Sequence, residues 1–431
     1  MDKQVLREVI ADQEKAWVLP EPLVVRHIPD IQPLKEAKQI VILTGIRRCG
    51  KSTLLGQIRK TSAEKDYFIN FDDDRLVDFA LEDFQALYEL FVELYGPQKT
   101  FYFDEIQNIP DWERFVRRLF DEGHKIYITG SNASMLSVEL GTRLTGRYLE
   151  LHLYPYSFHE SLERSLKRQG TVVDLRHLTT VFKGLVKSYF EDFSKEGGLP
   201  EYIESPNQHY LHSLYESILY RDIIVRYKIK NHRALQELAH YLASNLGKEC
   251  SYSGLAKMLG VESSTTISNY CLYLENSFLC YFVSRYDVSL KKQIQIQSPK
   301  KVYFVDQALA MNVGFRFSKD EGRLLENIVF MELKRREKEI YFHKGKRECD
   351  FVLKEGPKIV EAIQVCLDMG GAETKEREVE GLVEALQAYG LEKGLIITQD
   401  TRAQIEHVVD GKIYEIDVVP IWLWLLQLGI K

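Results

Sequence analysis

One stretch, residues 41–53 with the sequence VILTGIRRCGKST, constrains the fold more than any other part of the chain. An aliphatic run ends at Gly45, and Gly50, Lys51 and Ser52 follow at the spacing G-x-x-x-x-G-K-S, ahead of a helix-like segment. Glycines at these two positions allow successive backbone N–H groups to point at phosphate oxygens, and a helix N-terminus adds partial positive charge. The pattern therefore predicts a strand, a phosphate-binding loop and a helix.

The polar residues of this loop have distinct predicted roles. Lys51 is expected to reach the β- and γ-phosphates of a nucleotide, and the Ser52 hydroxyl to bind Mg²⁺. Gly45, Gly50 and Thr53 complete the predicted binding site for ATP with Mg²⁺. A chance match is the alternative, because glycine followed by lysine is common in loops. The strand before the loop and the helix after it favour phosphate binding.

Residues 39–155 alternate apolar strands with amphipathic helices. Strands are expected at 39–43, 67–71, 100–103, 125–129 and 148–153, with helices starting near residues 52, 81, 111 and 134. This alternation is typical of a parallel sheet with helices on both faces. The predicted fold class is therefore α/β, with a P-loop NTPase domain built on a parallel sheet.

A second motif, FYFDE at 101–105, ends the third predicted strand. Asp104 and Glu105 would lie at the carboxyl edge of the sheet, where ligands bind in open α/β folds. Asp104 is expected to hold Mg²⁺ through its water shell, and Glu105 to orient or deprotonate an attacking water. A solvated pair of loop carboxylates is the alternative, but the phosphate-binding loop upstream favours a catalytic role. The acidic run 72–74 is expected to cap a turn, with contact to metal or substrate as its alternative.

Polar residues follow the fourth predicted strand. Ser131 and Asn132 are placed to bond a γ-phosphate or the attacking water, although capping of the next helix explains them equally well. Arg147 and, second, Arg143 lie in a glycine-flanked loop and are candidates for stabilising charge in phosphoryl transfer. A surface salt bridge is the alternative for either arginine. An arginine acting on a neighbouring chain would require a homo-oligomer.

Length and composition bound the class of protein. A chain of 431 residues should contain about two to four domains, and 45% hydrophobic with 28% charged residues is ordinary for a globular protein. The net charge of −6 excludes a generally basic nucleic-acid coat but allows a local basic patch. The cysteines show no metal-binding spacing, the first residues are charged, and the apolar run 418–428 is too short to span a bilayer. We therefore expect a cytoplasmic protein with no membrane partner.

Several stretches together resemble one known family. GIRRCGKSTLL, FYFDEIQNIPDW, YITGSNASML and LTGRYLELHLYPYSFHE are similar to archaeal and bacterial AAA-type P-loop ATPases with a long C-terminal domain of uncharacterised function. EGGLPEY at 196–202, SILYRDIIVRY at 217–227, KVYFVDQALA at 301–310 and LLENIVFMEL at 324–333 extend the resemblance over nearly the whole chain. The resemblance implies an ATPase core, a helical lid, a winged helix and a terminal domain similar to PD-(D/E)xK nucleases. The expected divisions are a lead-in at 1–38, the P-loop domain at 39–155, a helical lid or connector at 156–245, the winged helix at 246–300 and the nuclease-like domain at 301–431.

Residues 246–300 fit a helix-turn-helix with a wing. Helices are expected at 253–259 and 264–278, and the exposed face of the second would carry Thr265, Thr266, Ser268, Asn269 and Tyr273. This helix has no lysine or arginine and carries Glu275, so it would gain little from counterion release on DNA. Phosphate contacts would have to come from the wing, at Lys291 and Lys292, and from Lys300 and Lys301. Binding of double-stranded or branched DNA is predicted, with a purely protein-contacting winged helix as the alternative.

The terminal domain offers a second set of candidate site residues. The resemblance implies that an active nuclease needs a carboxylate on the first helix, an aspartate on the second strand, and an acid and a lysine on the third. Glu326 and Asp350 occupy the first two positions, but Gln364 and Cys366 stand at the last two. Gln364 binds metal poorly and Cys366 supplies no positive charge, so a structural or DNA-binding remnant is predicted.

The leading hypothesis is a Mg²⁺-dependent ATPase that couples hydrolysis to rearrangement of the winged helix and the nuclease-like module on DNA. One alternative is a nucleotide-controlled switch that binds protein partners without DNA, which the cation-free helix and the net negative charge favour. The second is an ATP-gated, metal-dependent nuclease, against which Gln364 and Cys366 argue.

Overall fold

The computed structural model describes residues 1–17, 19, 24–27, 36–62, 67–131, 144, 146–170, 179–287, 298–314 and 321–426. Two compact units make up the chain: Met1–Pro155 with Asn276–Phe278, and Tyr156–Glu275 with Leu279–Lys431. Asn132, Arg143, Lys291 and Lys292 lie outside the described residues, as does the helix expected near residue 134. Within the described part, no helix combines the length and the apolar character that a membrane crossing requires.

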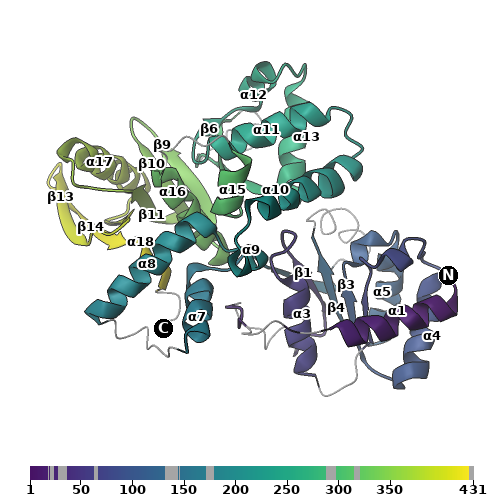
Figure 1. Ribbon diagram of the computed structural model, residues 1–431. Coiled ribbons are helices and arrows are strands. Elements are labelled where there is room, and N and C mark those ends of the chain that lie inside the picture. The colour runs from purple at the N-terminus through teal and green to yellow at the C-terminus, as the bar shows by residue number, and fades with distance from the viewer. Residues whose placement is uncertain are drawn as a thin grey trace. The chain divides into compact units, whose positions relative to one another are not determined.

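The first unit is built on a parallel five-stranded sheet (Figure 1). Its strands are β1 (Ile40–Thr44), β2 (Tyr67–Asn70), β3 (Thr100–Asp104), β4 (Lys125–Gly130) and β5 (Tyr148–His152). They pair in parallel in the order β2-β3-β4-β1-β5. Its helices and 3₁₀ turns are α1 (Lys3–Ala16), α3 (Lys51–Lys60), η1 (Asp74–Leu76), α4 (Asp83–Tyr95), η2 (Ile106–Asn108) and α5 (Trp112–Asp121). The predicted α/β class with a parallel sheet is confirmed.

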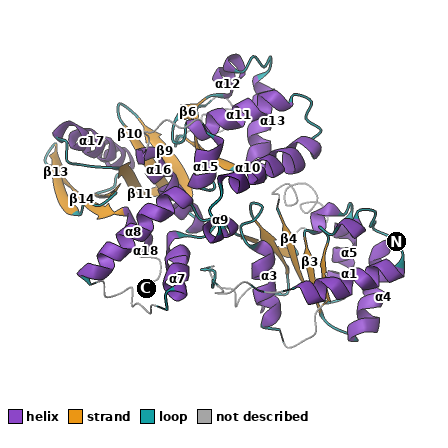
Figure 2. Cartoon of the chain, viewed as in Figure 1, coloured by secondary structure: helices purple, strands orange, loops and turns teal. Residues whose placement is uncertain are grey.

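Helices cover both faces of this sheet (Figure 2). Alternate strand residues such as Ile40 and Ile42 join one buried cluster with α1, α4 and α5, whereas α3 packs on the other face. Strand alternation sends neighbouring side chains to opposite faces, which explains why these central strands are apolar throughout. Helix α1 belongs to the core through Leu6, Val9 and Ile10, so the expected lead-in segment begins with a core helix.

Two polar side chains form hydrogen bonds at the edge strand β2 and in the turn that follows it. The Gln13 amide donates to the Asn70 carbonyl at 3.0 Å and accepts from the Asn70 N–H at 2.8 Å, so a side chain takes the place of a further strand. Asp73 caps η1 by accepting from the Arg75 N–H at 3.1 Å. The acidic run 72–74 therefore contains a helix cap, which was the expected structural role.

The second unit begins with helices and continues into two sheets. Its first helices are α7 (Phe158–Arg168), α8 (Thr180–Glu196), α9 (Pro200–Glu204), α10 (Gln208–Ser217), the π-helix η4 (Ile218–Val225) and α11 (His232–Ser244). The next elements are β6 (Glu249–Cys250), α12 (Tyr252–Met258), α13 (Ser264–Asn276), β7 (Cys280–Ser284) and β8 (Lys300–Phe304). Strands β6, β8 and β7 form an antiparallel sheet in that order.

The chain ends in a mixed six-stranded sheet. Its elements are α15 (Gln307–Val313), α16 (Glu321–Arg335), β9 (Glu339–Lys344), β10 (Glu348–Glu355), β11 (Lys358–Cys366), α17 (Ala372–Tyr389), β12 (Lys393–Thr398), β13 (Ala403–Val409), β14 (Lys412–Pro420) and α18 (Ile421–Leu426). The strand order is β13-β14-β12-β11-β10-β9, with parallel pairing only between β11 and β12 and between β12 and β14. The expected boundary at 300/301 falls inside β8, which belongs to the preceding three-stranded sheet.

Strand β8 and the turn after it hold three distant segments together. The Asn327 side chain of α16 accepts from the Phe304 N–H at 2.8 Å and donates to the Phe304 carbonyl at 2.9 Å. Asp306, which caps α15, accepts from the Gly198 N–H at 2.7 Å, and a Cβ on Gly197 would lie 2.4 Å from its carboxylate. The motifs KVYFVDQALA, LLENIVFMEL and EGGLPEY therefore meet at one buried strand end.

Replacing Asn327 with alanine should destabilise the second unit by about 2–5 kcal/mol, because it leaves the buried N–H and carbonyl of Phe304 without partners. Differential scanning calorimetry measures the loss. Asn269→Ala, the same substitution at an exposed position of α13, should change stability by no more than about 0.5 kcal/mol. Equal effects of the two substitutions would contradict the bridging role of Asn327.

Candidate functional site

The loop between β1 and α3 has a backbone that only glycine adopts easily at two positions. Gly45 has φ +145°, and a Cβ there would lie 2.1 Å from the Leu153 carbonyl oxygen. Gly50 has φ 99° and caps α3. Lys51 and Ser52 begin α3, with Thr53 also in its first turn, so their N–H groups belong to the unpaired donors of a helix start. The unpaired N–H donors at this helix start can bind an anion.

Lys51 is buried beneath the loop. Its ammonium donates to the carbonyl oxygens of Gly45 and Ile46 at 3.1 Å each and lies 3.9 Å from Glu105. The lysine is therefore held in the loop by backbone acceptors. A phosphate that displaced those carbonyls would provide the ammonium with stronger, charge-assisted hydrogen bonds.

Asp104 ends β3 with no exposed surface. Its Oδ1 accepts from the Ser52 hydroxyl at 3.0 Å and from the Thr129 hydroxyl at 2.5 Å, whereas the buried Oδ2 has no hydrogen-bond partner. Burial, reinforced by the neighbouring Glu105, raises the pKa of Asp104 to about 6. A hydroxyl beside a carboxylate with a free oxygen is an oxygen-ligand set that Mg²⁺ accepts, so Ser52 and Asp104 fit the expected metal.

Glu105 is held by its neighbours in an unusual backbone conformation. Its φ of 52° lies in the left-handed region, and its N–H donates to the Thr129 hydroxyl at 2.9 Å. Its carboxylate accepts from the Gln107 amide and lies 3.5 Å from the Ser131 hydroxyl. Ser131 is buried at this site, so the structure brings together the loop, Asp104, Glu105 and Ser131 at one edge of the sheet.

Three further residues of this site, Thr129, Gln107 and Arg26, were not predicted from the sequence. Thr129 touches both acidic residues, and Gln107 holds the Glu105 carboxylate. Arg26 donates to the carbonyls of Cys49 at 2.9 Å and Tyr154 at 2.6 Å, which fixes the loop from the N-terminal segment. Thr129 ends the fourth predicted strand and could have been noticed there. Arg26 and Gln107 have no sequence pattern that separates them from ordinary polar residues.

Arg147 was a candidate for action either in its own chain or in a neighbour, and the structure places it away from the phosphate-binding loop of its own chain. Arg147 directly precedes β5, and Tyr148 pairs with Ile40 at the amino end of β1. The phosphate-binding loop follows the other end of β1, about 13 Å away at about 3.3 Å per residue. The Arg147 side chain lies 3.5 Å from Asp121, which was the alternative of a salt bridge.

Helix α13 exposes part of its expected polar face. Thr265 and Asn269 are exposed, whereas Thr266, Ser268 and Tyr273 are half-buried, and Tyr273 stacks on Tyr227 with ring centroids 3.8 Å apart. Glu275 turns inward, and its carboxylate accepts from the Phe282 N–H at 3.4 Å. Burial raises the pKa of Glu275. Glu275, the one charged residue of α13, therefore does not belong to its exposed polar face.

We call the elements from α16 to α18 the terminal module. Its predicted site residues Glu326, Asp350 and Gln364 lie in one buried cluster. Gln364 accepts from the Asp350 N–H at 3.1 Å, and Asp350 and Glu326 share a contact with Lys301 of β8 at 3.0 Å and 3.1 Å. Cys366 instead contacts the Asp368 carbonyl. The lysine of this cluster therefore comes from outside the terminal sheet.

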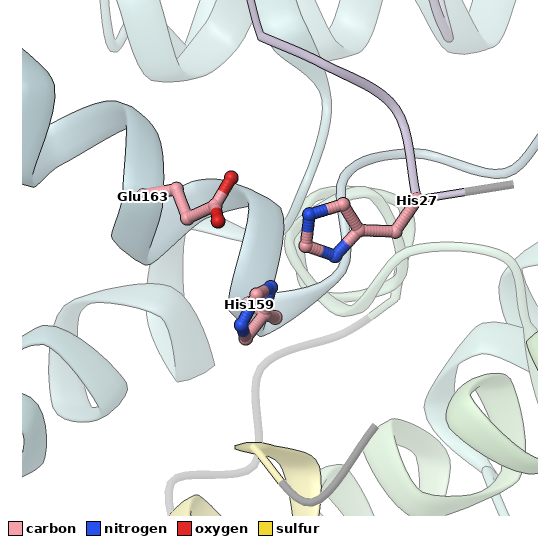
Figure 3. Close-up of side chains that lie close together, drawn as sticks. All are labelled: His27, His159 and Glu163. Atoms are coloured by element: carbon pink, nitrogen blue, oxygen red, sulfur yellow. The ribbon is translucent and has the colours of Figure 1, made fainter. Parts of the chain in front are cut away.

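A histidine and a glutamate lie one turn apart on α7. Figure 3 shows His159 and Glu163 with His27, which belongs to the first unit. Because a helix places residues four apart on one face, the α7 pair follows from helical geometry alone. Two ligands on one helix do not make a metal centre.

Comparisons with known proteins agree with the nucleotide site. Residues 37–162 match the family model described as AAA domain, and residues 188–320 match a domain of unknown function, DUF8612. Solved structures of the Aeropyrum pernix ORC1 protein in complex with DNA and of Cdc6p from Pyrobaculum aerophilum are similar, with 13% and 11% identity and TM-scores of 0.28 and 0.29. The matches cover 72% and 77% of this chain and 90% and 98% of those chains.

Sequence relatives extend over the full length. Uncharacterized protein MJ1544 of Methanocaldococcus jannaschii is 33% identical, and the match covers 99% of this chain and 96% of that protein. An uncharacterized protein of Haemophilus influenzae is 30% identical, with coverage of 93% and 98%. The chain therefore belongs to the family of these two proteins, and within it residues 37–162 match the AAA domain.

Proposed function

We propose that this chain binds ATP together with Mg²⁺ and hydrolyses it. One observation carries the proposal: the buried Asp104 carboxylate meets the Ser52 hydroxyl of the phosphate-binding loop at 3.0 Å and keeps its Oδ2 without a partner. A buried carboxylate oxygen without a partner is costly unless a cation or proton satisfies it. Mg²⁺ at this place would satisfy that oxygen.

Each residue of the site has a chemical role in the proposed reaction. Lys51 binds the β- and γ-phosphates, and Ser52 and Asp104 hold the metal, which neutralises phosphate charge when bound. Glu105 accepts a proton from, or orients, the attacking water, while Thr129 and Gln107 fix its backbone and carboxylate. Ser131 lies within 3.5 Å of Glu105 and bonds the water or the γ-phosphate.

Hydrolysis as proposed here does not require Arg147. Its position at the amino edge of the sheet means that a charge-stabilising role would need a second subunit, and Arg147 would then have to leave Asp121. A homo-oligomer is therefore part of the proposal only if Arg147 acts at the active site of a neighbouring subunit.

We further propose that the second unit binds DNA through a winged helix made of α11, β6, α12, α13, β7 and β8. The order helix, strand, two helices and two strands matches that of a helix-turn-helix with a wing. Although α13 has no cations, the turn after η4 carries the exposed Lys228 and Lys230, and Tyr227 in the same turn stacks on α13. These lysines can supply phosphate contacts beside Thr265 and Asn269.

A protein partner is the second candidate for the same face. The apolar side chains of Leu272 on α13 and Met258 on α12 are each 50% exposed. Exposed apolar groups on a helix favour contact with protein over contact with phosphate. The two candidates differ in how binding responds to salt.

The first prediction from the proposed function concerns the rate of ATP hydrolysis. Lys51→Ala and Glu105→Gln should each lower kcat by about 10²-fold or more, because one removes phosphate charge stabilisation and the other removes the base. Phosphate release by the purified chain measures the rate. Lys60→Ala, which removes an exposed lysine at the far end of α3, should leave turnover unchanged. Turnover that survives both site substitutions would contradict the proposed active site.

The second prediction concerns pH. Because the pKa of Asp104 is raised to about 6, its stabilising contribution to the metal-free fold is present at low pH and is lost as pH rises through about 6. Mg²⁺ needs the ionised carboxylate, so the gain in melting temperature from Mg²⁺ with an ATP analogue should be larger at pH 7 than at pH 5. The nucleotide phosphates also titrate in this range, and Asp104→Asn is therefore the control. If the variant shows the same pH dependence as the wild type, Asp104 does not hold the metal.

The third prediction separates DNA from protein binding. Lys228→Glu with Lys230→Glu should weaken duplex DNA binding and reduce the slope of log K against log salt by about 0.9 for each phosphate that is no longer neutralised. Gel-shift titration across a salt series measures both quantities. Lys358→Glu with Lys375→Glu makes the same charge change on exposed positions of the terminal module and should have little effect. Binding that is absent, or insensitive to salt, would favour the protein-partner candidate.

A further inference from the structure

Lys301 of β8 is a buried lysine surrounded by carboxylates from two other elements. Its side chain is 1% exposed, and its ammonium lies 2.8 Å from Glu348, 3.0 Å from Asp350 and 3.1 Å from Glu326. Burial alone would lower the pKa of Lys301, but the surrounding acidic groups raise it well above its usual value. The lysine is therefore a cation, and its three N–H donors face three carboxylates.

Both oxygens of Asp350, and the Glu326 oxygen that faces the cluster, already accept hydrogen bonds. Asp350 gives Oδ1 to Lys301 and accepts the Val365 N–H on Oδ2 at 3.0 Å. The Glu326 oxygen that faces Lys301 also accepts from the Tyr303 hydroxyl at 2.5 Å. Every one of these contacts directs a donor at the lone pairs that a divalent ion would use.

Gln364 is also unavailable as a ligand. Its carbonyl oxygen accepts from the Asp350 N–H at 3.1 Å, and its amide nitrogen donates to Glu378 at 2.5 Å. Among the described residues, the carboxylates of this cluster do not form a group of three ligand atoms lying within 4.8 Å of one another. The residues present therefore do not fit the metal that a nuclease-like fold implies.

We propose that the Lys301 ammonium is the permanent cation of this cluster, closing it to divalent metal ions and turning a nuclease-like site into a structural junction between β8, α16 and β10. Like a metal ion, the lysine compensates the buried negative charge. Unlike a metal ion, it does not activate water. It arrives from β8, so the compensation also fixes the three-stranded sheet to the terminal module. This proposal does not depend on ATP hydrolysis at the first unit.

The test replaces the ammonium with an apolar chain of similar length. Lys301→Met should lower the melting temperature of the full chain by roughly 10 °C, because it leaves buried carboxylates without a counter-ion. Mn²⁺ should restore much of that loss in Lys301→Met and should not do so in Lys301→Met with Asp350→Asn. Lys301→Arg, which keeps the positive charge, should remain stable without Mn²⁺.

Calorimetric titration with Mn²⁺ gives an independent readout. The wild type and Asp350→Asn should show the same Mn²⁺ binding, since any metal bound at the first unit is common to both. Loss of binding in Asp350→Asn would overturn the proposal, as would a Lys301→Met chain that keeps full stability without Mn²⁺ or stays unfolded at every Mn²⁺ concentration. Plasmid DNA incubated with the wild type and Mn²⁺ should stay intact; cleavage that vanishes in Asp350→Ala would show that the site still takes metal.

Discussion

The buried carboxylate of Asp104 is the constraint on which the nucleotide site depends. Strand β4 lies between β3 and β1, and the register places Thr129 of β4 opposite Leu43 of β1. From there the Thr129 hydroxyl donates to the Asp104 carboxylate and accepts from the Glu105 N–H. The sheet order therefore brings the end of β3 against the phosphate-binding loop without a direct pairing of their strands. An ionised group without exposure is tolerated there because hydroxyl donors and a cation can share it.

The second unit also contains a buried acidic cluster, but its negative charge is compensated in a different way. Asp104 keeps one oxygen without a partner, whereas both oxygens of Asp350 are taken by Lys301 and the Val365 N–H. The first arrangement leaves a place for a metal and the second fills it with an ammonium. Lys301 and Tyr303 point to the same side of β8, and Asn327 pairs with the adjacent Phe304 backbone, so this strand joins the two sheets of the unit.

Sequence predicted the elements of the first unit because its signals are local. The ends of the expected strands lie within a residue or two of the ends of the five observed strands. The order of strand, loop and helix around Gly45 to Thr53 follows from spacing alone. The position of Arg147 was also predictable, since a residue just before a parallel strand lies at the amino edge. The glycine-containing loop before Arg147 suggested a role in phosphoryl transfer, either in the same chain or in a neighbour, and the position at the amino edge argues against the first of these.

The remaining site residues depend on tertiary structure. Thr129 contacts Asp104 only because β3 and β4 are neighbours, and Gln107 finds Glu105 through the turn at η2. Lys301 lies far from Gln364 in sequence, and no linear motif could identify it as the lysine of the acidic cluster. The sequence shows that Glu275 is charged but not which way its side chain points. That orientation follows from the hydrogen bond that the Phe282 N–H of β7 donates to it.

The most direct test of the account is a crystal structure of the chain with Mg²⁺ and a non-hydrolysable ATP analogue. We expect the metal at the Ser52 hydroxyl with Asp104 in its coordination shell, and the Lys51 ammonium moved from the carbonyls of Gly45 and Ile46 onto the phosphates. A nucleotide bound elsewhere, or bound at the loop with Lys51 still on those carbonyls and no metal beside Asp104, would contradict it.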